Sequence, residues 1–304
     1  MKTGRYGLSA RFPFLRRGRA RKIKRFSGGE LAAYIIAFII MGAVAVSYIL
    51  AFLWAATAAT KTHTEIVMRP FSLHKVWHFE NYVNAFRDLS VKGIGMWGMI
   101  LNSLWYMIGG AAIGLFGLTL MAYAIVRFRF VGRKVLIGIN YVIITLPILG
   151  ALPAQYRMMA NLGLTNSPLF LAQFWGGFGA TMLIIQSVFR GLTDGYREAA
   201  LIDGAGEYRI LFGIMLPLVR APMTALFVLQ TVGLWNDYLI PLLYLPDLPT
   251  LSTGIYMFSQ TMVFHARMDT LMAATVLSSL PPIVLYVIFN KSMLNSLTIG
   301  GLKE

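Results

Sequence analysis

The chain has 304 residues, of which 57% are hydrophobic and 13% are charged, whereas an ordinary soluble domain has about 25% charged residues. This composition argues against a soluble globular domain, and it also argues against disorder, which requires low hydrophobicity. The absence of cysteine excludes a disulfide scaffold, a cysteine-ligated metal site and a cysteine nucleophile. The net charge is +15, and its distribution along the chain is informative.

Residues 1–30 form a basic tail that carries 10 of the 27 lysines and arginines. A long apolar run begins directly after it, at Leu31. A basic cluster beside a membrane span is typical of a cytoplasmic anchor that anionic membrane lipid attracts. We expect no nucleic acid partner, because no recognition module accompanies the tail.

Six runs of mostly apolar residues are long enough to cross a membrane, which takes about 17–25 such residues. These runs are residues 31–55, 99–126, 135–152, 169–189, 223–245 and 271–289. Runs of this kind must be helical, because an open strand edge has no hydrogen-bond partner in lipid. We therefore expect an all-α, polytopic membrane helix bundle with six transmembrane helices. The first run is too long for a cleaved signal peptide, whose apolar region spans about 7–15 residues, although Ala56-Thr57-Ala58 resembles a cleavage site.

The positions of the basic residues predict the orientation. With the N-terminus inside, the inner segments carry 20 lysines and arginines and the outer segments carry 7, which follows the positive-inside rule. Both termini are then cytoplasmic and the chain is a multi-pass membrane protein. The predicted parts are the tail (1–30), the first helix with a long outer loop that carries short surface helices (31–98), a transmembrane core (99–290) with a cytoplasmic loop at 190–220, and a cytoplasmic C-terminal tail (291–304).

Two pairs of small residues at a spacing of four predict close helix packing in the core. They are Gly110 with Gly114 in the second run, and Gly176 with Ala180 in the fourth. Small side chains at this spacing let helix backbones approach closely. We interpret both pairs as packing features.

Several kinds of chemistry are missing from the sequence. It has no Gly-Lys dipeptide, hence no Walker A loop for ATP phosphates, and no Gly-x-Ser-x-Gly nucleophile elbow. His74 and His78 have a chelating spacing, but no carboxylate pattern surrounds them, and we expect no metal site. Asp237 is the one clear acid inside a run, where it lies either in a wet cavity or near the interface. These observations give no candidate ATP-binding loop and no candidate nucleophile elbow in the sequence.

The loop at 190–220 mixes four acids and four bases with many Ala, Leu and Ile residues. This pattern predicts two short helices joined by a turn. Asp194 is expected to cap the first helix with its carboxylate, and Gly204 and Gly206 to end it in left-handed conformations. An ordered amphipathic loop of this kind suits docking into a groove on another protein, and the alternative is an interfacial helix that lies on lipid.

The same loop carries a motif at complete spacing. Glu198-Ala199-Ala200 is followed by Gly204 and then by Ile214-Met215-Leu216-Pro217. This pattern resembles the EAA loop of permease subunits of binding-protein-dependent ABC importers. Further segments resemble the maltose-type carbohydrate branch of that family and extend the similarity from Asn102 to Glu304; they are Asn102-Ser103-Leu104, residues 122–130, residues 162–167, Trp235-Asn236-Asp237-Tyr238 with Pro241-Leu242, and Gly300-Gly301-Leu302-Lys303.

The resemblance implies a coupling helix that docks on an ATP-binding subunit, where ATP and Mg are bound. Glu198 would make a charged contact, Ala199 and Ala200 would pack, and Gly204 would set the turn. The residues implied in docking are Glu198, Ala199, Ala200, Ile202, Asp203, Gly204, Ala205, Ile214, Leu216 and Pro217. The implied partners are a second permease subunit, two ATP-binding subunits and an extracytoplasmic sugar-binding protein. The resemblance also implies a bacterial-type cell (inner) membrane as the location, and no enzyme activity and no bound cofactor for this chain.

Aromatic and amide side chains suit sugar stacking and hydroxyl pairing. The candidates for the substrate path are Tyr106, Gln173, Gln230, Trp235, Asn236 and Asp237. The function that the family resemblance implies is a permease subunit of an ATP-driven importer, which moves a carbohydrate delivered by the binding protein. A self-sufficient secondary transporter is the alternative, and it would need ion-coupling residues and internal repeats. A membrane scaffold whose loop recruits partners is the third hypothesis.

Overall fold

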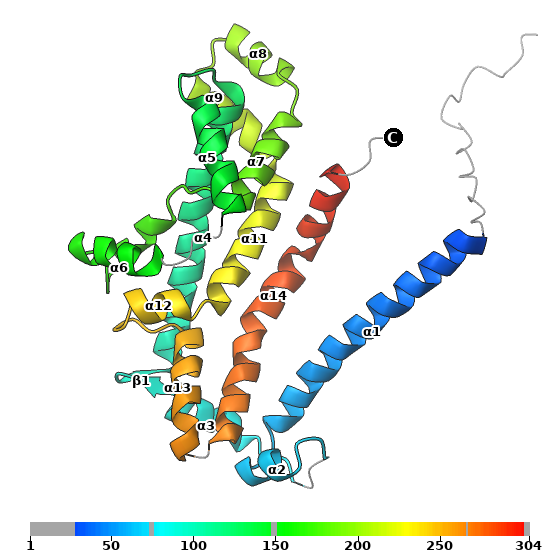
Figure 1. Cartoon of the computed structure of the whole chain (residues 1–304), viewed down its shortest axis with the longest axis vertical. Coiled ribbons are helices and arrows are strands. Elements are labelled where there is room, and N and C mark those ends of the chain that lie inside the picture. Colours follow the sequence, from blue (N-terminus) through cyan, green and yellow to red (C-terminus); the bar gives the residue numbers. More distant parts are fainter. Residues whose placement is uncertain (1–27, 73–75, 147–150, 266, 301–304) are drawn as a thin grey trace, which may run out of the picture. The chain divides into compact units, whose positions relative to one another are not determined.

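The computed structural model describes residues 28–72, 76–146, 151–265 and 267–300 (Figure 1). The chain divides into two units, residues 1–52 and 53–304. Within the described residues the protein is all-α apart from one short hairpin, which confirms that part of the predicted fold class. His74 and the two terminal segments 1–27 and 301–304 lie outside the described residues.

The first apolar run forms α1 (Gly28–Ala58), which has 31 residues. At a rise of 1.5 Å per residue this helix is about 46 Å long, and the hydrocarbon core of a bilayer is about 30 Å thick. The helix is therefore long enough to span a membrane. It contains one charged residue, Glu30 in its first turn.

Residues 59–95 form a small ordered layer with two short helices, α2 (His63–Met68) and α3 (Glu80–Asp88), and a hairpin of β1 (Ser90–Val91) and β2 (Ile94–Gly95). The surface helices predicted for this loop are confirmed. Thr62 and Glu65 form a capping box at the start of α2. Asn81 is buried and donates to the carbonyls of Ala59 and Lys61 at 3.0 and 2.9 Å. These bonds fix the chain where it leaves α1.

The helix α4 (Met96–Arg127) is the central element of the second unit, where it packs against α7, α11, α13 and a 3₁₀ segment. Its glycines allow a close approach. A Cβ added at Gly117 would lie 2.4 Å from the amide nitrogen of Gly176, and one at Gly110 would lie 2.9 Å from Leu234 Cδ1. The packing role predicted for Gly110 is thereby confirmed, and Gly117 is a further close contact.

The third and fourth predicted runs are not continuous helices. Residues 133–145 form α5 (Arg133–Thr145), and α6 (Ala151–Asn161) begins after four residues that are not described. The fourth run divides into the 3₁₀ helix η1 (Pro168–Phe174) and α7 (Ala180–Arg190). Gly176, Gly177 and Gly179 have φ angles of +71°, +131° and +142°, which L side chains rarely adopt and which end helical geometry. The prediction that Gly176 and Ala180 share a helix face was therefore wrong.

The loop region contains α8 (Gly195–Ile202), α9 (Glu207–Ile210), the π-helical η2 (Leu211–Met215) and α10 (Leu216–Leu218). The chain then bends by 80° into α11 (Arg220–Asn236). It breaks at Asp237 and continues as α12 (Leu239–Tyr244), α13 (Leu251–His265) and α14 (Met268–Gly300). The fifth predicted run is thus split between α11 and α12.

Among the described residues, α1, α4 and α14 are long and apolar enough to cross a membrane, and α9–α10 with α11 form a fourth span if the bent pair is counted as one. In Figure 1 α8 and α9 lie at one end of α4, while α3 and β1 lie at the other end. The loop at residues 190–220, called the motif loop below, and the ordered layer of residues 59–95 therefore lie at opposite ends of α4.

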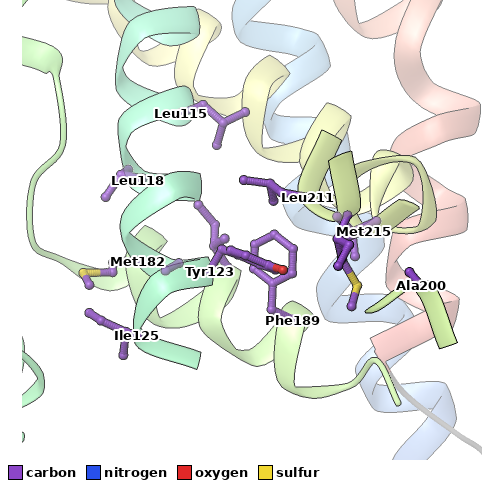
Figure 2. Packing of buried hydrophobic residues seen from close by; sticks show 13 residues of the cluster. Leu115, Leu118, Tyr123, Ile125, Met182, Phe189, Ala200, Leu211 and Met215 are labelled. Carbon is purple, nitrogen blue, oxygen red and sulfur yellow. The ribbon is translucent and has the colours of Figure 1, made fainter. Parts of the chain in front are cut away.

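The core beside the motif loop is a cluster contributed by α4, α7, α8 and the α9–α10 region (Figure 2). Tyr123 and Phe189 are buried with ring centroids 5.5 Å apart in an edge-on arrangement. Leu211 and Met215 of η2 belong to the same buried cluster. This packing holds the short loop helices against α4 and α7, at the ends of these helices that we predict to be cytoplasmic.

Candidate functional site

The motif helix α8 presents an exposed edge. Ile202 is 87% exposed and Tyr208 on α9 is 81% exposed, so two large side chains project from this part of the loop. Glu198, Ala199, Asp203 and Gly204 are also exposed along this stretch. Ala200 differs, because it is only 6% exposed and lies in the chain's own core cluster. The first alanine of the motif thus faces outward, and the second fastens the helix to the bundle.

The turn after α8 has the geometry that the sequence predicts at one glycine and not at the other. Gly204 has a φ of +77°, a left-handed conformation that glycine adopts at little cost. Gly206 has a φ of −71° and is the residue before α9, so the prediction that it ends the first helix in a left-handed turn was wrong. The remaining motif residues sit behind the turn: Ala205, Ile214 and Leu216 are half-buried and Pro217 is exposed at the bend into α11.

Arg127, the last residue of α4, ties the membrane core to the start of α8. Its side chain is 6% exposed, and one Nη atom donates to the backbone carbonyls of Phe189 and Leu192 at 2.8 and 3.0 Å. The other Nη pairs with the carboxylate of Asp194. Asp194 precedes α8 but makes no capping bond, so the predicted cap was wrong: the carboxylate serves the arginine instead.

A second link joins α8 to α9. Arg197 pairs with the carboxylate of Glu207, with Nε 3.3 Å from Oε2. Tyr123 of α4 donates its hydroxyl to the same carboxylate at 3.2 Å, and Phe128 lies under the guanidinium at 5.7 Å. Burial opposes the charge on Arg197, but the hydrogen bond to Glu207 outweighs it and raises the pKa of the guanidinium. The end of α4 therefore contacts both loop helices.

Sequence reasoning did not assign roles to Arg127, Arg197 or Glu207. The balance of four acids and four bases in residues 190–220 was the available signal, since such a balance indicates ion pairs within an ordered loop. The sequence does not show which acid meets which base, because Arg127 and Asp194 are 67 residues apart.

The residues predicted for the substrate path divide into buried and exposed ones. Tyr106 is fully buried and donates to Asp237 Oδ2 at 2.9 Å. Asp237 Oδ1 accepts from the amides of Leu239 and Ile240 at 3.1 and 3.2 Å, so the acid caps α12. Trp235 is 1% exposed and donates its indole N–H to the carbonyl of Ser278 at 2.9 Å.

The two predicted glutamines are half-buried. Gln173 accepts from Gln155 at 3.3 Å, while its own Nε2 is buried without a partner among the described residues. Gln230 Oε1 is likewise buried and unpaired there, beside Gly114. Of the six candidates, Asn236 alone is exposed.

Three connecting segments meet at Asp247. Its carboxylate pairs with Lys92 Nζ at 2.6 Å and with the amide group of Asn166, and its own N–H donates to Asn166 Oδ1 at 2.8 Å. The hydrogen bond from Lys92 is the main reason why the pKa of Asp247 is lowered. Lys92 and Asn166 have φ angles of +50° and +56°, so this network holds two non-glycine residues in a strained region.

Residues 113–296, more than half of the chain, match the family described as binding-protein-dependent transport system inner membrane component. The chain belongs to this family. It is therefore a membrane permease of the ABC transporter class, and the membrane location predicted from its spans is confirmed.

Curated relatives at 30% identity or more include two kinds of uptake-system permease. The chain is 32% identical over 278 residues, 90% of each protein, to the diacetylchitobiose uptake system permease protein NgcG of Streptomyces coelicolor. It is 30% identical to the sn-glycerol-3-phosphate transport system permease protein UgpE of Escherichia coli, covering 80% of this chain and 88% of that one. A crystal structure of a bacterial ABC transporter involved in the import of alginate contains a chain with the same fold, at a TM-score of 0.70 and 20% identity, covering 88% of this chain and 98% of that one.

Proposed function

We propose that this chain is the permease subunit of an ATP-driven importer that moves a carbohydrate delivered by an extracytoplasmic binding protein. Family membership supports the importer class. The carbohydrate class is supported by relatives named for diacetylchitobiose and for arabinooligosaccharides, the second 26% identical over 74% of this chain. In this proposal the chain crosses the membrane six times and both termini are cytoplasmic. The interrupted runs that contain α7 and α11 are two of the six spans.

The proposed partners are a second permease, two ATP-binding subunits and the binding protein. ATP hydrolysis takes place in the ATP-binding subunits, and this chain performs no covalent chemistry. ATP binding draws those subunits together, and the motif loop moves with the subunit on which it docks. The membrane path then faces the binding protein, and hydrolysis resets it. The residues proposed for the substrate path are Tyr106, Gln173, Gln230, Trp235, Asn236 and Asp237.

The observation that carries the proposal is the exposed edge of α8 together with its attachment. Glu198, Ala199 and Ile202 face outward, while Ala200 is buried in the bundle core. Arg127 and the Arg197–Glu207 pair fasten the same helix to α4. A surface that is apolar, charged and rigidly joined to the membrane helices suits the transfer of force from a docked partner.

The test compares Glu198→Lys and Gly204→Asp with a matched control, Arg220→Glu. Arg220 is an exposed charge at the start of α11 and lies outside the α8 edge. Each variant is expressed in cells that lack the wild-type chain, and uptake of radiolabelled diacetylchitobiose and arabino-oligosaccharides is measured beside the amount of chain in the membrane. We expect the two α8 variants to lose uptake at normal membrane levels and the control to retain it. Unchanged uptake in both α8 variants would contradict the proposal and favour a self-sufficient transporter.

A further inference from the structure

A pocket of about 280 Å³ opens where α11 ends, between the start of α12 and the helices α13 and α14. The pocket lies at the C-terminal end of α11, beside the break at Asp237, whereas the loop at residues 190–220 leads into the N-terminal end of that helix. Seven of its nine lining residues carry polar side chains: Asn236, Tyr238, Ser252, Tyr256, Ser259, Thr275 and Ser278. Among the described residues that line it, none is charged.

Two tyrosines form one wall of the pocket. Tyr238 and Tyr256 stack with ring centroids 4.5 Å apart and an interplanar angle of 25°. Tyr238 is 41% exposed. Neither phenolic hydroxyl has a hydrogen-bond partner within the described part of the chain, and Asn236 uses only its Nδ2 group, in a bond of 2.9 Å to the carbonyl of Val232. The pocket thus combines an aromatic wall with unused donors and acceptors.

The backbone behind this wall is held from two neighbouring helices. Ser252 and Thr253 of α13 donate to the carbonyls of Trp235 and Tyr238 at 2.5 and 3.1 Å. The indole of Trp235 reaches the carbonyl of Ser278 on α14. Four attachments, including the bonds that Asp237 accepts from the first amides of α12, therefore fix the junction of α11 and α12 that carries Asn236 and Tyr238. A site fixed in this way before binding loses little conformational entropy when it is occupied.

We infer that this pocket is a contact site for one uncharged sugar ring, contributed by this permease itself. The inference rests on the proposed function and makes it more specific. An aromatic wall matches the apolar face of a pyranose, and amide and hydroxyl groups match its ring hydroxyls. The volume lies just below the range of about 300–1,000 Å³ that takes drug-sized ligands, which suits one ring of an oligosaccharide. A phosphate or uronate ligand is disfavoured, because a buried anion needs a paired charge.

The absence of cysteine from the chain allows a direct test of occupancy. Ser259→Cys places a thiol in the pocket with little change in size, and Thr261→Cys places one on an exposed position of α13 outside it. The assembled importer, in proteoliposomes with its binding protein and ATP, is treated with a small charged methanethiosulfonate reagent. We expect diacetylchitobiose to slow the labelling of the pocket cysteine severalfold and to leave the control cysteine unchanged. Labelling of Ser259→Cys that the sugar does not change would overturn the inference, as would a thiol that never reacts because another protein covers it.

A transport assay separates this site from the coupling surface. Tyr238→Ala and Tyr256→Ala remove the aromatic wall, while Tyr286→Ala removes an exposed tyrosine of α14 that does not line the pocket. We expect the two pocket variants to raise the half-saturating concentration for diacetylchitobiose uptake by about tenfold, with unchanged ATPase activity of the complex without sugar, and the control to behave as wild type. Wild-type kinetics in both pocket variants would overturn the inference that the pocket contacts a sugar ring. If Glu198→Lys is inactive in the same assay, the proposed function is unaffected by that result. A wild-type importer that carries only anionic substrates would overturn the sugar class and the pocket together.

Discussion

Replacing Arg127 with methionine tests how the membrane core holds the motif loop. The substitution keeps a flexible stem but replaces the guanidinium, which removes the bonds to Phe189 and Leu192 and the ion pair with Asp194. Hydrogen bonds from a charged donor contribute about 1.5–3 kcal/mol each, so the two carbonyl bonds contribute roughly 3–6 kcal/mol before water replaces them. Asp194 is 72% exposed, and its ion pair adds at most about 1 kcal/mol. Water can reach the freed carbonyls at the end of α7, and we expect a net loss of about 3 kcal/mol in the attachment of α8.

Hydrogen exchange of the purified complex in nanodiscs measures this loss. A free energy of about 3 kcal/mol corresponds to a rise of roughly a hundredfold in the opened population and in the exchange rate of protected amides. We expect this rise in peptides that cover α8 and the end of α7, and unchanged exchange in α13. Arg127→Lys is the matched variant, since it keeps the charge but lacks the fork that reaches several acceptors. It should give an intermediate rise. Wild-type exchange in α8 of Arg127→Met would refute the reasoning.

Three further predictions concern other contacts. Arg197→Glu and Glu207→Arg should each reduce uptake, and the double swap should restore a good part of it; single variants that transport normally would show that the pair does not position the loop. Gly117→Ala would bring a Cβ within 2.4 Å of the backbone of Gly176, so we expect a loss of about 1–3 kcal/mol and a lower detergent melting temperature, and a melting temperature equal to wild type would contradict the close contact. The pKa of Asp247 is lowered in the folded protein, so its network contributes stability at neutral pH and loses it only as pH falls below the ordinary value of 3.8; Asp247→Asn should loosen residues 163–167 in hydrogen exchange at pH 7, and constant protection in that variant would contradict the assignment.

The sequence predicts those features that depend on composition and local chemistry. The apolar runs at residues 31–55, 99–126 and 271–289 became α1, α4 and α14, because a long apolar run has no alternative to a helix in lipid. The left-handed turn at Gly204 follows from glycine's lack of a side chain, and that prediction is confirmed. The family was predicted from the spacing of the same loop and is confirmed.

Other features depend on contacts between distant parts of the chain. The run at residues 169–189 reads as one apolar helix, yet its glycines let the backbone leave helical geometry where Gly176 meets α4. Trp235 was predicted on the substrate path from residue type alone, but the structure buries its indole against α14. Asp194 was predicted as a cap from its position, whereas its partner comes from the end of α4. The docking role of the loop and the sugar path stay predictions.

The central claim is that the exposed edge of α8 docks on an ATP-binding subunit. Ile202→Cys would give the chain one cysteine at the most exposed apolar position of α8, and Val131→Cys is a control on another exposed turn. Each is labelled in native membranes with a maleimide benzophenone, irradiated, and the crosslinked product identified by mass spectrometry. The account predicts a crosslink from position 202 to a protein with a Walker A loop, and none to that protein from position 131. Crosslinks from position 202 to lipid alone would contradict the account and show that α8 lies on the membrane surface.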